Sequence, residues 1–493
     1  MTQRILLSIE VSQRPQGRVH VIPITDAGFD ALRKGVPVEV TGLDANGVQR
    51  VRALAELTRF AGQAGAHLPV MLGADRLAVL VGLGRETTRR SLREAAAAAT
   101  GIVPAGVPWS FFVPAWTPSA IPAEEMLAAA AEGLALGPYT FRTTARPAPA
   151  LAGPCHLVSE LRTDRAQPAF TRALALAEGV ILARDLVNRP AEDLGPDELA
   201  DAAADVARAR GFAVAVLRGD EVERRGFRLV HRVGRASHRP PTVTVIEHRV
   251  GPADPSLALI GKGVVFDTGG LDIKTGGNMA LMRKDMGGAG AVIGALDAIG
   301  RIGTSLPFIA VIPAAENAIG PLAMRPGDVI CAYDGQTVEI GNTDAEGRLL
   351  LADALGYARE RRALRIVDAA TLTGAARLAL GPDLPALFGT DEDLVARLLD
   401  VAARSDEPLW RLPLVDRYES WIDTPFADVN NSSTDRRAGA ITAALFLRRF
   451  ARDSRWAHID VYAWEDRGFA GTPRGANGMG VRTLAELVLG LSS

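Results

Sequence analysis

Residues 257–294 read LALIGKGVVFDTGGLDIKTGGNMALMRKDMGGAGAVIG, and this stretch decides what kind of fold the chain can adopt. It opens with the uniformly apolar, β-branched pattern that is typical of a strand buried on both faces. The glycine-rich part that follows carries three lysines and three aspartates: Lys262, Asp267, Asp272, Lys274, Lys284 and Asp285. Charges at the carboxyl end of a buried strand cost free energy unless they bind something, and open α/β sheets hold their ligands at that end. The stretch therefore predicts an α/β sheet with a binding site at its edge.

The rest of the chain repeats the alternation of strands and helices. Three further apolar, β-branched runs lie at residues 306–316, 364–372 and 456–464. With the helical patterns between them, they predict a large three-layer α/β/α domain at residues 188–493, with a central sheet that is mostly parallel or mixed. Strand-like runs alternating with alanine-rich runs predict a separate N-terminal α/β domain at residues 1–165. Apolar residues spaced three and four apart predict a connecting helix at residues 166–187.

Lysine is rare in this chain and is concentrated in one place. Only four of the 55 basic residues are lysines, and three of them, Lys262, Lys274 and Lys284, lie in the quoted stretch. Arginine is always charged, whereas a lysine can lose its proton when it is buried or binds a metal. Two explanations for the clustered lysines are therefore open. The function of this stretch requires an amine that can be neutral or compact, or the cluster results from codon bias and chance.

Composition excludes several classes of protein. A chain of 493 residues with 48 % hydrophobic and 23 % charged residues is neither disordered nor fibrous. Its net charge of −2 gives no overall basic field for nucleic acid, although a local patch stays open. Cys155 and Cys331 are too few for a disulfide framework. No apolar run approaches the length of a signal peptide core or of a membrane span, so we expect a cytoplasmic protein without a membrane partner.

A second acidic cluster, EIGNTDAEGR, follows further along the chain. Asp344, Glu346 and Arg348 alternate, so in an extended chain their side chains point to one face. Together with Asp267 and Asp285, the two acids supply four carboxylates, enough to hold two divalent cations about 3.5 to 4 Å apart. Two other interpretations are open: a salt-bridge cluster with the lysines, or a surface turn with a capping carboxylate.

These motifs carry a resemblance to a known family. NTDAEGR at 342–348, GKG-x-x-FD from residue 261 and KDM-x-GA from residue 284 resemble the leucyl aminopeptidase (cytosol aminopeptidase) family of dinuclear metallopeptidases. The segments NRPAEDLGPDELA, VDAATLTGA, AGAITAALFLRRF and WAHIDV match the family in the same order, so the resemblance covers most of residues 185–482. It implies that residues 188–493 are the metallopeptidase catalytic domain.

The resemblance also implies a set of metal ligands. Asp267 and Glu346 would bridge two divalent cations, Mn²⁺ or Zn²⁺. Lys262, as a neutral amine, and Asp285 would complete one site, and Asp344 would complete the other through its side chain and main-chain carbonyl. The α-amine of a peptide would bind the cation that Lys262 coordinates, so cleavage would follow the first residue.

The remaining roles are implied in the same way. Lys274 would stay protonated and polarise the scissile carbonyl. Arg348 would hold a bicarbonate that acts as general base for a water bridging the two cations. The substrate-binding residues would be Met282, Asn342, Thr371, Leu372 and Gly374. Specificity would be broad with a preference for leucine-like residues, because an apolar pocket discriminates by only about 1 to 3 kcal/mol per methylene.

The chain departs from the family pattern after WAHIDV. YAWEDR replaces a run of small residues near the substrate pocket, so Tyr462, Trp464 and Glu465 leave the first-residue preference open. Lys284 receives no role and is interpreted as a solvated or structural charge. The family implies a homohexamer acting on peptides with a free N-terminus. The alternative functions are a non-catalytic or regulatory hexamer that binds nucleic acid, for which the charge gives no support, and another di-metal hydrolase.

Overall fold

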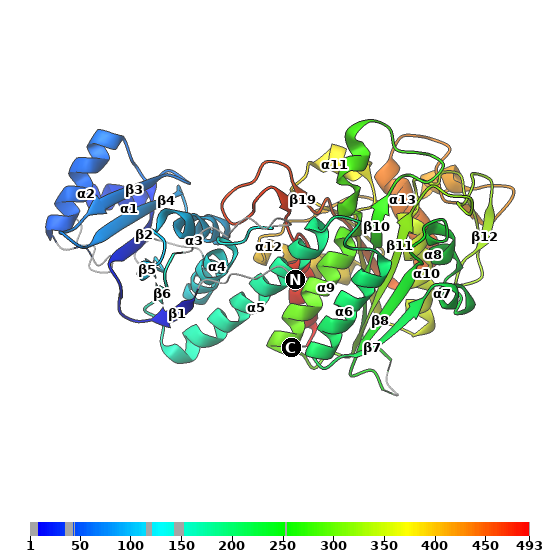
Figure 1. Cartoon of the computed structure of the whole chain (residues 1–493), viewed down its shortest axis with the longest axis horizontal. Coiled ribbons are helices and arrows are strands. Elements are labelled where there is room, and N and C mark those ends of the chain that lie inside the picture. Colours follow the sequence, from blue (N-terminus) through cyan, green and yellow to red (C-terminus); the bar gives the residue numbers. More distant parts are fainter. Residues whose placement is uncertain are drawn as a thin grey trace. The chain divides into compact units, whose positions relative to one another are not determined.

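The computed structural model describes residues 8–34, 43, 45–114, 121–141, 152–251 and 254–492. The chain forms two compact units, each of which is described by itself below (Figure 1). Unit 1 comprises Met1–Glu178 and Arg467–Arg474, and unit 2 comprises Gly179–Asp466 and Gly475–Ser493. Helix α5 (Thr163–Asn188) runs through the boundary between them. The division into an N-terminal domain, a connecting helix and a catalytic domain, with limits at residues 165 and 187, remains a prediction from the sequence.

Unit 1 is built around a six-stranded sheet with the order β1-β6-β5-β2-β4-β3, parallel except for β3. Its strands are β1 (Ile9–Ser12), β2 (Val19–Thr25), β3 (His67–Met71), β4 (Leu77–Gly84), β5 (Trp109–Phe112) and β6 (Cys155–Val158). Its helices besides α5 are α1 (Asp26–Arg33), α2 (Ala45–Thr58), α3 (Arg89–Ile102) and α4 (Ala123–Leu136). Successive side chains of β4 point to opposite faces of the sheet, and each face is covered by helices. Val79 and Val81 pack toward α3 and α4, whereas Leu80 packs toward α1 and α2.

Unit 2 contains a nine-stranded mixed sheet. Its order is β16-β15-β18-β14-β9-β11-β8-β7, with β10 paired to β11. The strands are β7 (Ala213–Arg218), β8 (Thr242–His248), β9 (Leu257–Gly261), β10 (Gly263–Asp267), β11 (Phe308–Asn317), β14 (Arg365–Ala370), β15 (Ala386–Gly389), β16 (Trp410–Arg411) and β18 (Arg455–Asp460). The central strands run parallel, and antiparallel pairs flank them at β7-β8-β11 and at β15-β18. The predicted α/β class is confirmed.

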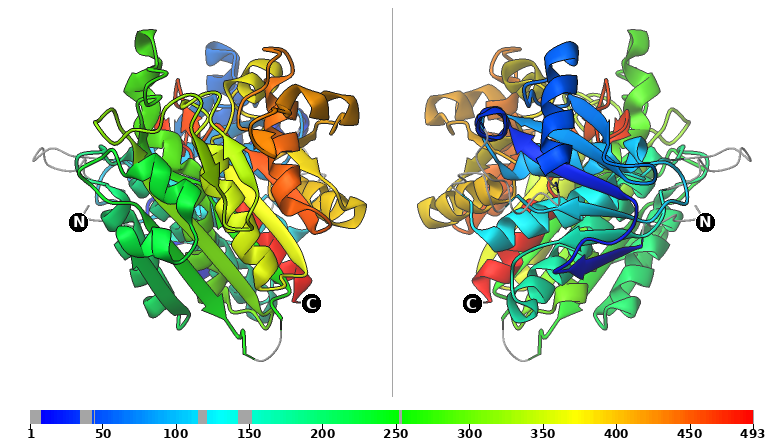
Figure 2. Two further views of the ribbon diagram at one scale, coloured as in Figure 1. Left: turned by 90° about the vertical axis from the view of Figure 1, so that its right-hand side faces the viewer. Right: turned by 90° about the vertical axis from the view of Figure 1, so that its left-hand side faces the viewer.

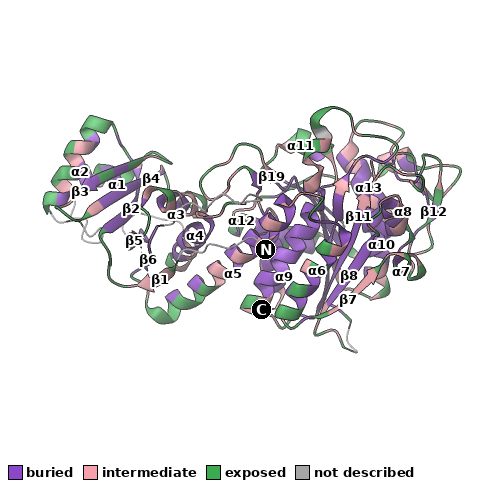
Figure 3. Ribbon diagram, in the orientation of Figure 1, coloured by how far each residue is buried: buried purple, intermediate pink, exposed green. Residues whose placement is uncertain are grey.

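Helices cover both faces of this sheet. One layer contains α6 (Pro196–Ala209), α9 (Gly287–Ile302), α12 (Glu392–Arg404) and α14 (Val481–Leu491). The other contains α8 (Arg228–Gly234), α10 (Gly347–Glu360) and α13 (Gly439–Ala451). Figure 3 shows the central strands and the inner faces of these helices as buried. The uniformly apolar runs of the sequence are explained by this burial on both sides.

Shorter elements complete unit 2 (Figure 2). They are α7 (Asp220–Arg224), α11 (Gly374–Leu380), the 3₁₀ helices η1 (Gly276–Met286) and η2 (Asp416–Ile422), and the strands β12 (Val329–Cys331), β13 (Thr337–Glu339), β17 (Val429–Asn430), β19 (Trp464–Glu465) and β20 (Gly475–Ala476). Both cysteines are free. Within the described part of the chain, no helix is long and apolar enough to cross a membrane.

Helix α9 lies unusually close to the sheet at its first turn, and this contact yields a stability prediction. A Cβ atom on Gly288 would overlap the carbonyl oxygen of Ala369 in β14, and neither backbone can move cheaply. Gly288→Ala should therefore destabilise the protein by about 1 to 3 kcal/mol through overpacking. The measurement is the midpoint of thermal unfolding. Gly490→Ala, in α14 with open space at its Cβ, is the control and should not lower the midpoint. An unchanged midpoint for Gly288→Ala would contradict the packing argument.

Candidate metal centre

The acidic residues singled out in the sequence meet at the carboxyl edge of the central strands. Asp267 is the last residue of β10, and Asp285 lies near the end of η1. Asp344 and Glu346 lie in the loop that leads into α10, whose first residue is Gly347. Parallel strands bring their carboxyl ends to the same edge of a sheet, so segments far apart in the sequence converge here.

The carboxylates are close enough to share cations. Oxygen atoms of Asp267, Asp344 and Glu346 lie within 4.8 Å of one another. Glu346 is buried, and its Oε2 has no hydrogen-bond partner among the described residues. Burial, together with the charges of Asp267 and Asp285, raises the pKa of Glu346 to about 8. Such crowded, buried carboxylate oxygens are the donor set that a hard divalent cation binds, so the residues fit a metal.

Lys262 lies in the middle of this cluster. Its Nζ is 2.8 Å from Oδ2 of Asp285 and 3.1 Å from Oε1 of Glu346, and it donates to the carbonyl of Thr371 at 2.7 Å. Burial alone lowers the pKa of Lys262, but the neighbouring carboxylate charges outweigh burial and raise it. With the carboxylates dominating its surroundings, the amine is therefore an ammonium group. A cation bound among the same carboxylates would oppose this effect and favour the neutral amine.

Lys274 holds the other two carboxylates. Its Nζ is 2.6 Å from Oδ2 of Asp267 and 2.6 Å from Oδ1 of Asp344. Burial lowers the pKa of Lys274, and the nearby carboxylates, Asp267 first among them, raise it by more. The salt-bridge interpretation and the metal interpretation of the sequence therefore use the same residues. The two lysines neutralise part of the charge that cations would otherwise balance.

Two of the predicted substrate-binding residues contact this cluster directly. The Thr371 hydroxyl donates to Oδ1 of Asp285 at 2.8 Å, and Oδ1 of Asn342 accepts from the backbone N–H of Asp344 at 2.8 Å. Leu372 follows Thr371 in the loop after β14. Met282 lies on η1, which also carries Asp285, and Gly374 begins α11.

Arg348 occupies the first turn of α10. Its Nη1 donates to the carbonyl of Asn431 at 2.7 Å, and its Cζ lies 6.0 Å from the ring centroid of Phe446. Its Nε has no hydrogen-bond partner among the described residues. Burial lowers the pKa of Arg348 to about 10, although Glu346 and Asp460 act in the opposite direction. The guanidinium stays charged at neutral pH and keeps an unused donor.

Sequence reasoning missed two residues that hold the site together. Asn317, the last residue of β11, donates to Oδ1 of Asp267 at 2.7 Å and to the carbonyl of Thr343 at 3.1 Å. Asp460, the last residue of β18, accepts at Oδ1 from the N–H groups of Leu372 and Thr373. The available signal was their position, because each is a polar residue at the carboxyl end of a buried strand.

His458 and Lys284 are both buried. His458 is a buried core residue, whose Nδ1 lies 2.5 Å from Oδ1 of Asp368 and whose ring stacks on Phe388 and Trp456. Lys284 is not solvated: it is buried, with Nζ 4.5 Å from the ring centroid of Tyr462, and burial lowers its pKa to about 8. It is therefore a structural charge.

Comparison with known proteins agrees with this geometry. Residues 181–485 match the model described as the cytosol aminopeptidase family, catalytic domain. The chain belongs to the cytosol aminopeptidase family. A probable cytosol aminopeptidase of Geobacter sulfurreducens is 39 % identical over 469 residues, which cover 93 % of each chain. One of Syntrophotalea carbinolica is 42 % identical over 380 residues, covering 75 % of this chain and 76 % of the relative.

Solved structures of family members are similar over nearly the whole chain. The cytosol aminopeptidase from Coxiella burnetii has a TM-score of 0.85 and 34 % identity, covering 98 % of this chain and 99 % of that one. The bottromycin maturation enzyme BotP in complex with Mn has the same score and identity, covering 97 % and 100 %. The predicted family is thereby confirmed, and the chain is a peptide hydrolase of the leucyl aminopeptidase type.

The three clustered lysines yield a prediction that separates function from codon bias. Lys262 has no room for a larger head group, because a Cβ on Gly347 would already lie 2.5 Å from its Cε. Lys262→Arg and Lys274→Arg should each lower the rate of peptide hydrolysis by about 100-fold or more, the usual cost of losing one stabilising donor. Lys284→Arg keeps a cation over Tyr462 and should stay within a few-fold of the parent. The measurement is kcat for release of leucine from leucyl amide, and near-normal rates for the first two variants would contradict the argument.

Proposed function

We propose that this cytosol aminopeptidase removes the N-terminal residue from peptides with the help of two divalent cations, Mn²⁺ or Zn²⁺. Lys262, Asp267, Asp285, Asp344 and Glu346 would hold them, with the family's division of ligands. The observation that carries the proposal is the cluster of buried Asp267, partly exposed Asp344 and buried Glu346, with Oε2 of Glu346 left without a hydrogen-bond partner among the described residues. Bound cations would supply a lowered pKa for water and a polarised carbonyl.

The two lysines differ in access, and this difference supports different roles. The side chain of Lys262 is 3 % exposed and that of Lys274 is 14 % exposed. A group that only binds a cation can be fully enclosed, whereas a group that meets the substrate must be reachable. Lys274 therefore stabilises the negative charge that develops on the scissile carbonyl oxygen, and its raised pKa keeps it protonated for this purpose.

Arg348 is proposed to hold a small anion such as bicarbonate. The unused donor at Nε and the burial of the guanidinium support this role, because a planar carboxylate-like anion can accept two parallel N–H bonds from it. Such an anion, held by Arg348 near Glu346, would supply a general base. The hydrogen bond from Nη1 to Asn431 fixes the direction in which the guanidinium points.

The substrate is proposed to lie along Met282, Asn342, Thr371, Leu372 and Gly374. A leucine-like first residue is preferred within a broad range. Open space around the Cβ position of Gly374 supports room for a side chain there. Tyr462 stands where the family has small residues near the substrate pocket. Its ring centroid lies 4.5 Å from Nζ of Lys284 and 4.0 Å from Cζ of Arg377, so it brings two cations with it. A homohexamer stays a prediction from the resemblance, and a cytoplasmic location stays a prediction from the lengths of the apolar runs. The nucleic-acid-binding alternative is not favoured.

The proposal is tested by loading and removing the metal. Purified protein with Mn²⁺ or Zn²⁺ should bind two cations per chain and release leucine from leucyl amide. A chelator should abolish the release, and added metal should restore it. Measurement of metal content and of free leucine on the same sample checks both expectations.

A blocked substrate is the matched control. Nα-acetyl-leucyl amide lacks the free amine and should not be cleaved. Binding of two cations per chain without release of leucine would contradict the proposed activity, and release from the acetylated substrate would contradict the proposed binding of the amine.

A further inference from the structure

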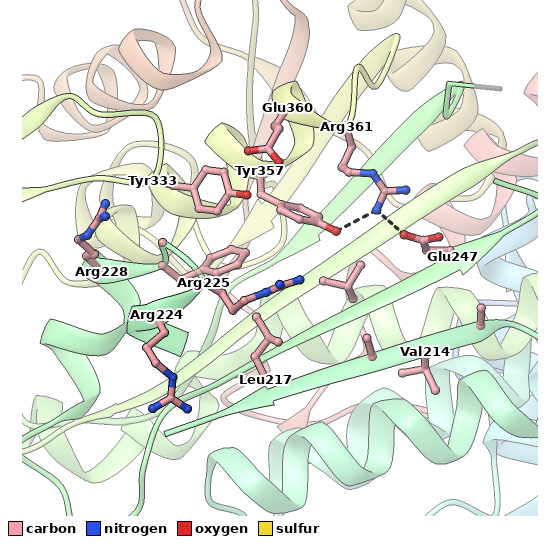
Figure 4. A pocket seen from close by; sticks show the side chains of 15 residues that line it. Val214, Leu217, Arg224, Arg225, Arg228, Glu247, Tyr333, Tyr357, Glu360 and Arg361 are labelled. Atoms are coloured by element: carbon pink, nitrogen blue, oxygen red, sulfur yellow. Dashed lines mark hydrogen bonds and ion pairs between the residues drawn. The ribbon is translucent and has the colours of Figure 1, made fainter. Parts of the chain in front are cut away.

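Unit 2 has a pocket where the central sheet ends at β7, and none of its lining residues belongs to the acidic cluster (Figure 4). The cavity measures about 800 Å³. Its floor is one face of the sheet, formed by Ala213, Ala215 and Leu217 of β7 and by Val245 and Glu247 of β8. Alternate residues of a strand share a face of the sheet. The small side chains of Ala213 and Ala215 on this face leave space for the cavity. The volume lies within the range of about 300 to 1,000 Å³ that small-molecule sites occupy.

One wall of the pocket is aromatic. The ring centroids of Phe227 and Tyr333 are 4.8 Å apart, those of Phe227 and Tyr357 5.5 Å, and those of Tyr333 and Tyr357 5.8 Å. Phe227 is buried, whereas the two tyrosines are partly exposed. The wall therefore offers aromatic surface to a ligand while its base is fixed in the core.

A buried carboxylate fixes this wall in place. Asp353, one helical turn before Tyr357 on α10, accepts from the N–H of Tyr333 at 2.8 Å and from those of Leu229 and Val230 at 2.8 and 3.1 Å. One side chain thus joins three segments that carry the wall. The wall is preorganised, which lowers the entropic cost of binding.

Three arginines lie at one side of the pocket. Figure 4 shows Arg224, Arg225 and Arg228 at the pocket, with Arg225 reaching between Tyr357 and Leu217. Among the described residues, none of these three guanidinium groups forms an ion pair with a carboxylate. A fourth, Arg361, is by contrast paired with Glu247 and donates to the Tyr357 hydroxyl at 2.9 Å. The lining contains four arginines and two glutamates, so it carries an excess of positive charge.

We propose that this pocket binds a nucleoside phosphate. The base lies against the wall of Tyr333 and Tyr357, and the phosphate is bound by the guanidinium groups of Arg224, Arg225 and Arg228. Guanidinium groups match phosphate oxygens in pairs, and a base is a flat ring that stacks on tyrosine. A purely apolar ligand would leave the arginines unused, and inorganic phosphate would leave the aromatic wall unused. The site is separate from the metal centre and from the proposed peptidase reaction.

The test is isothermal titration of the full-length protein, freed of metal by a chelator, with adenosine 5′-monophosphate, adenosine and inorganic phosphate. We expect the monophosphate to bind at least tenfold more tightly than either of the other two. Equal affinity for phosphate alone would overturn the aromatic part of the proposal, and equal affinity for adenosine would overturn the arginine part. No binding of the monophosphate at millimolar concentration would overturn the whole proposal.

Variants locate the binding. Ala215→Trp fills the floor from an exposed position, and the double change Arg225→Ala with Arg228→Ala removes two cations. Each should weaken binding of the monophosphate at least tenfold and leave the release of leucine by the metal-loaded protein unchanged. Arg397→Ala removes an exposed arginine of α12, which is not part of the pocket lining, and as the control it should bind as the parent does. Unchanged binding by both pocket variants would overturn the assignment to this pocket.

Discussion

Repulsion among four carboxylates at one sheet edge is the constraint on which the rest of the catalytic unit depends. Burial of apolar side chains positions the strands and loops that bring together Asp267, Asp285, Asp344 and Glu346. Their negative charges can only be tolerated if cations lie between them. Lys262 and Lys274 supply two positive charges that offset the carboxylates, and divalent cations would supply further positive charge. The enclosing layers then keep water away and so strengthen each of these interactions.

Neutral groups fix the direction of each charged one. The amide of Asn317 holds one oxygen of Asp267, and the hydroxyl of Thr371 holds one oxygen of Asp285. The carboxylate of Asp460 fixes the loop after β14, from which the carbonyl of Thr371 reaches Lys262. Such bonds cost little to form, but without them the charged side chains would rotate toward water.

The sequence allowed the fold class and the acidic cluster to be predicted, because both leave local patterns. Buried strands read as apolar runs, and charges directly after such a run stand out. Asn317 and Asp460 also end apolar runs, but their partners could not be predicted, since they act on segments 26 to 88 residues distant, through backbone groups that any sequence provides. The packing of Arg467–Arg474 with unit 1 and the burial of Lys284 against Tyr462 also depend on tertiary contacts alone.

Helix α10 connects the acidic loop of the metal centre with the aromatic wall of the pocket beside β7. It begins directly after Glu346 and carries both Asp353 and Tyr357 before it ends at Glu360. At 1.5 Å per residue, Glu346 and Tyr357 are spaced about 16 Å apart along a rigid axis. One inserted residue would turn Tyr357 by about 100° and take it out of the aromatic wall, while the acidic loop stayed intact. The length of this helix therefore fixes the position of the aromatic wall relative to the acidic loop.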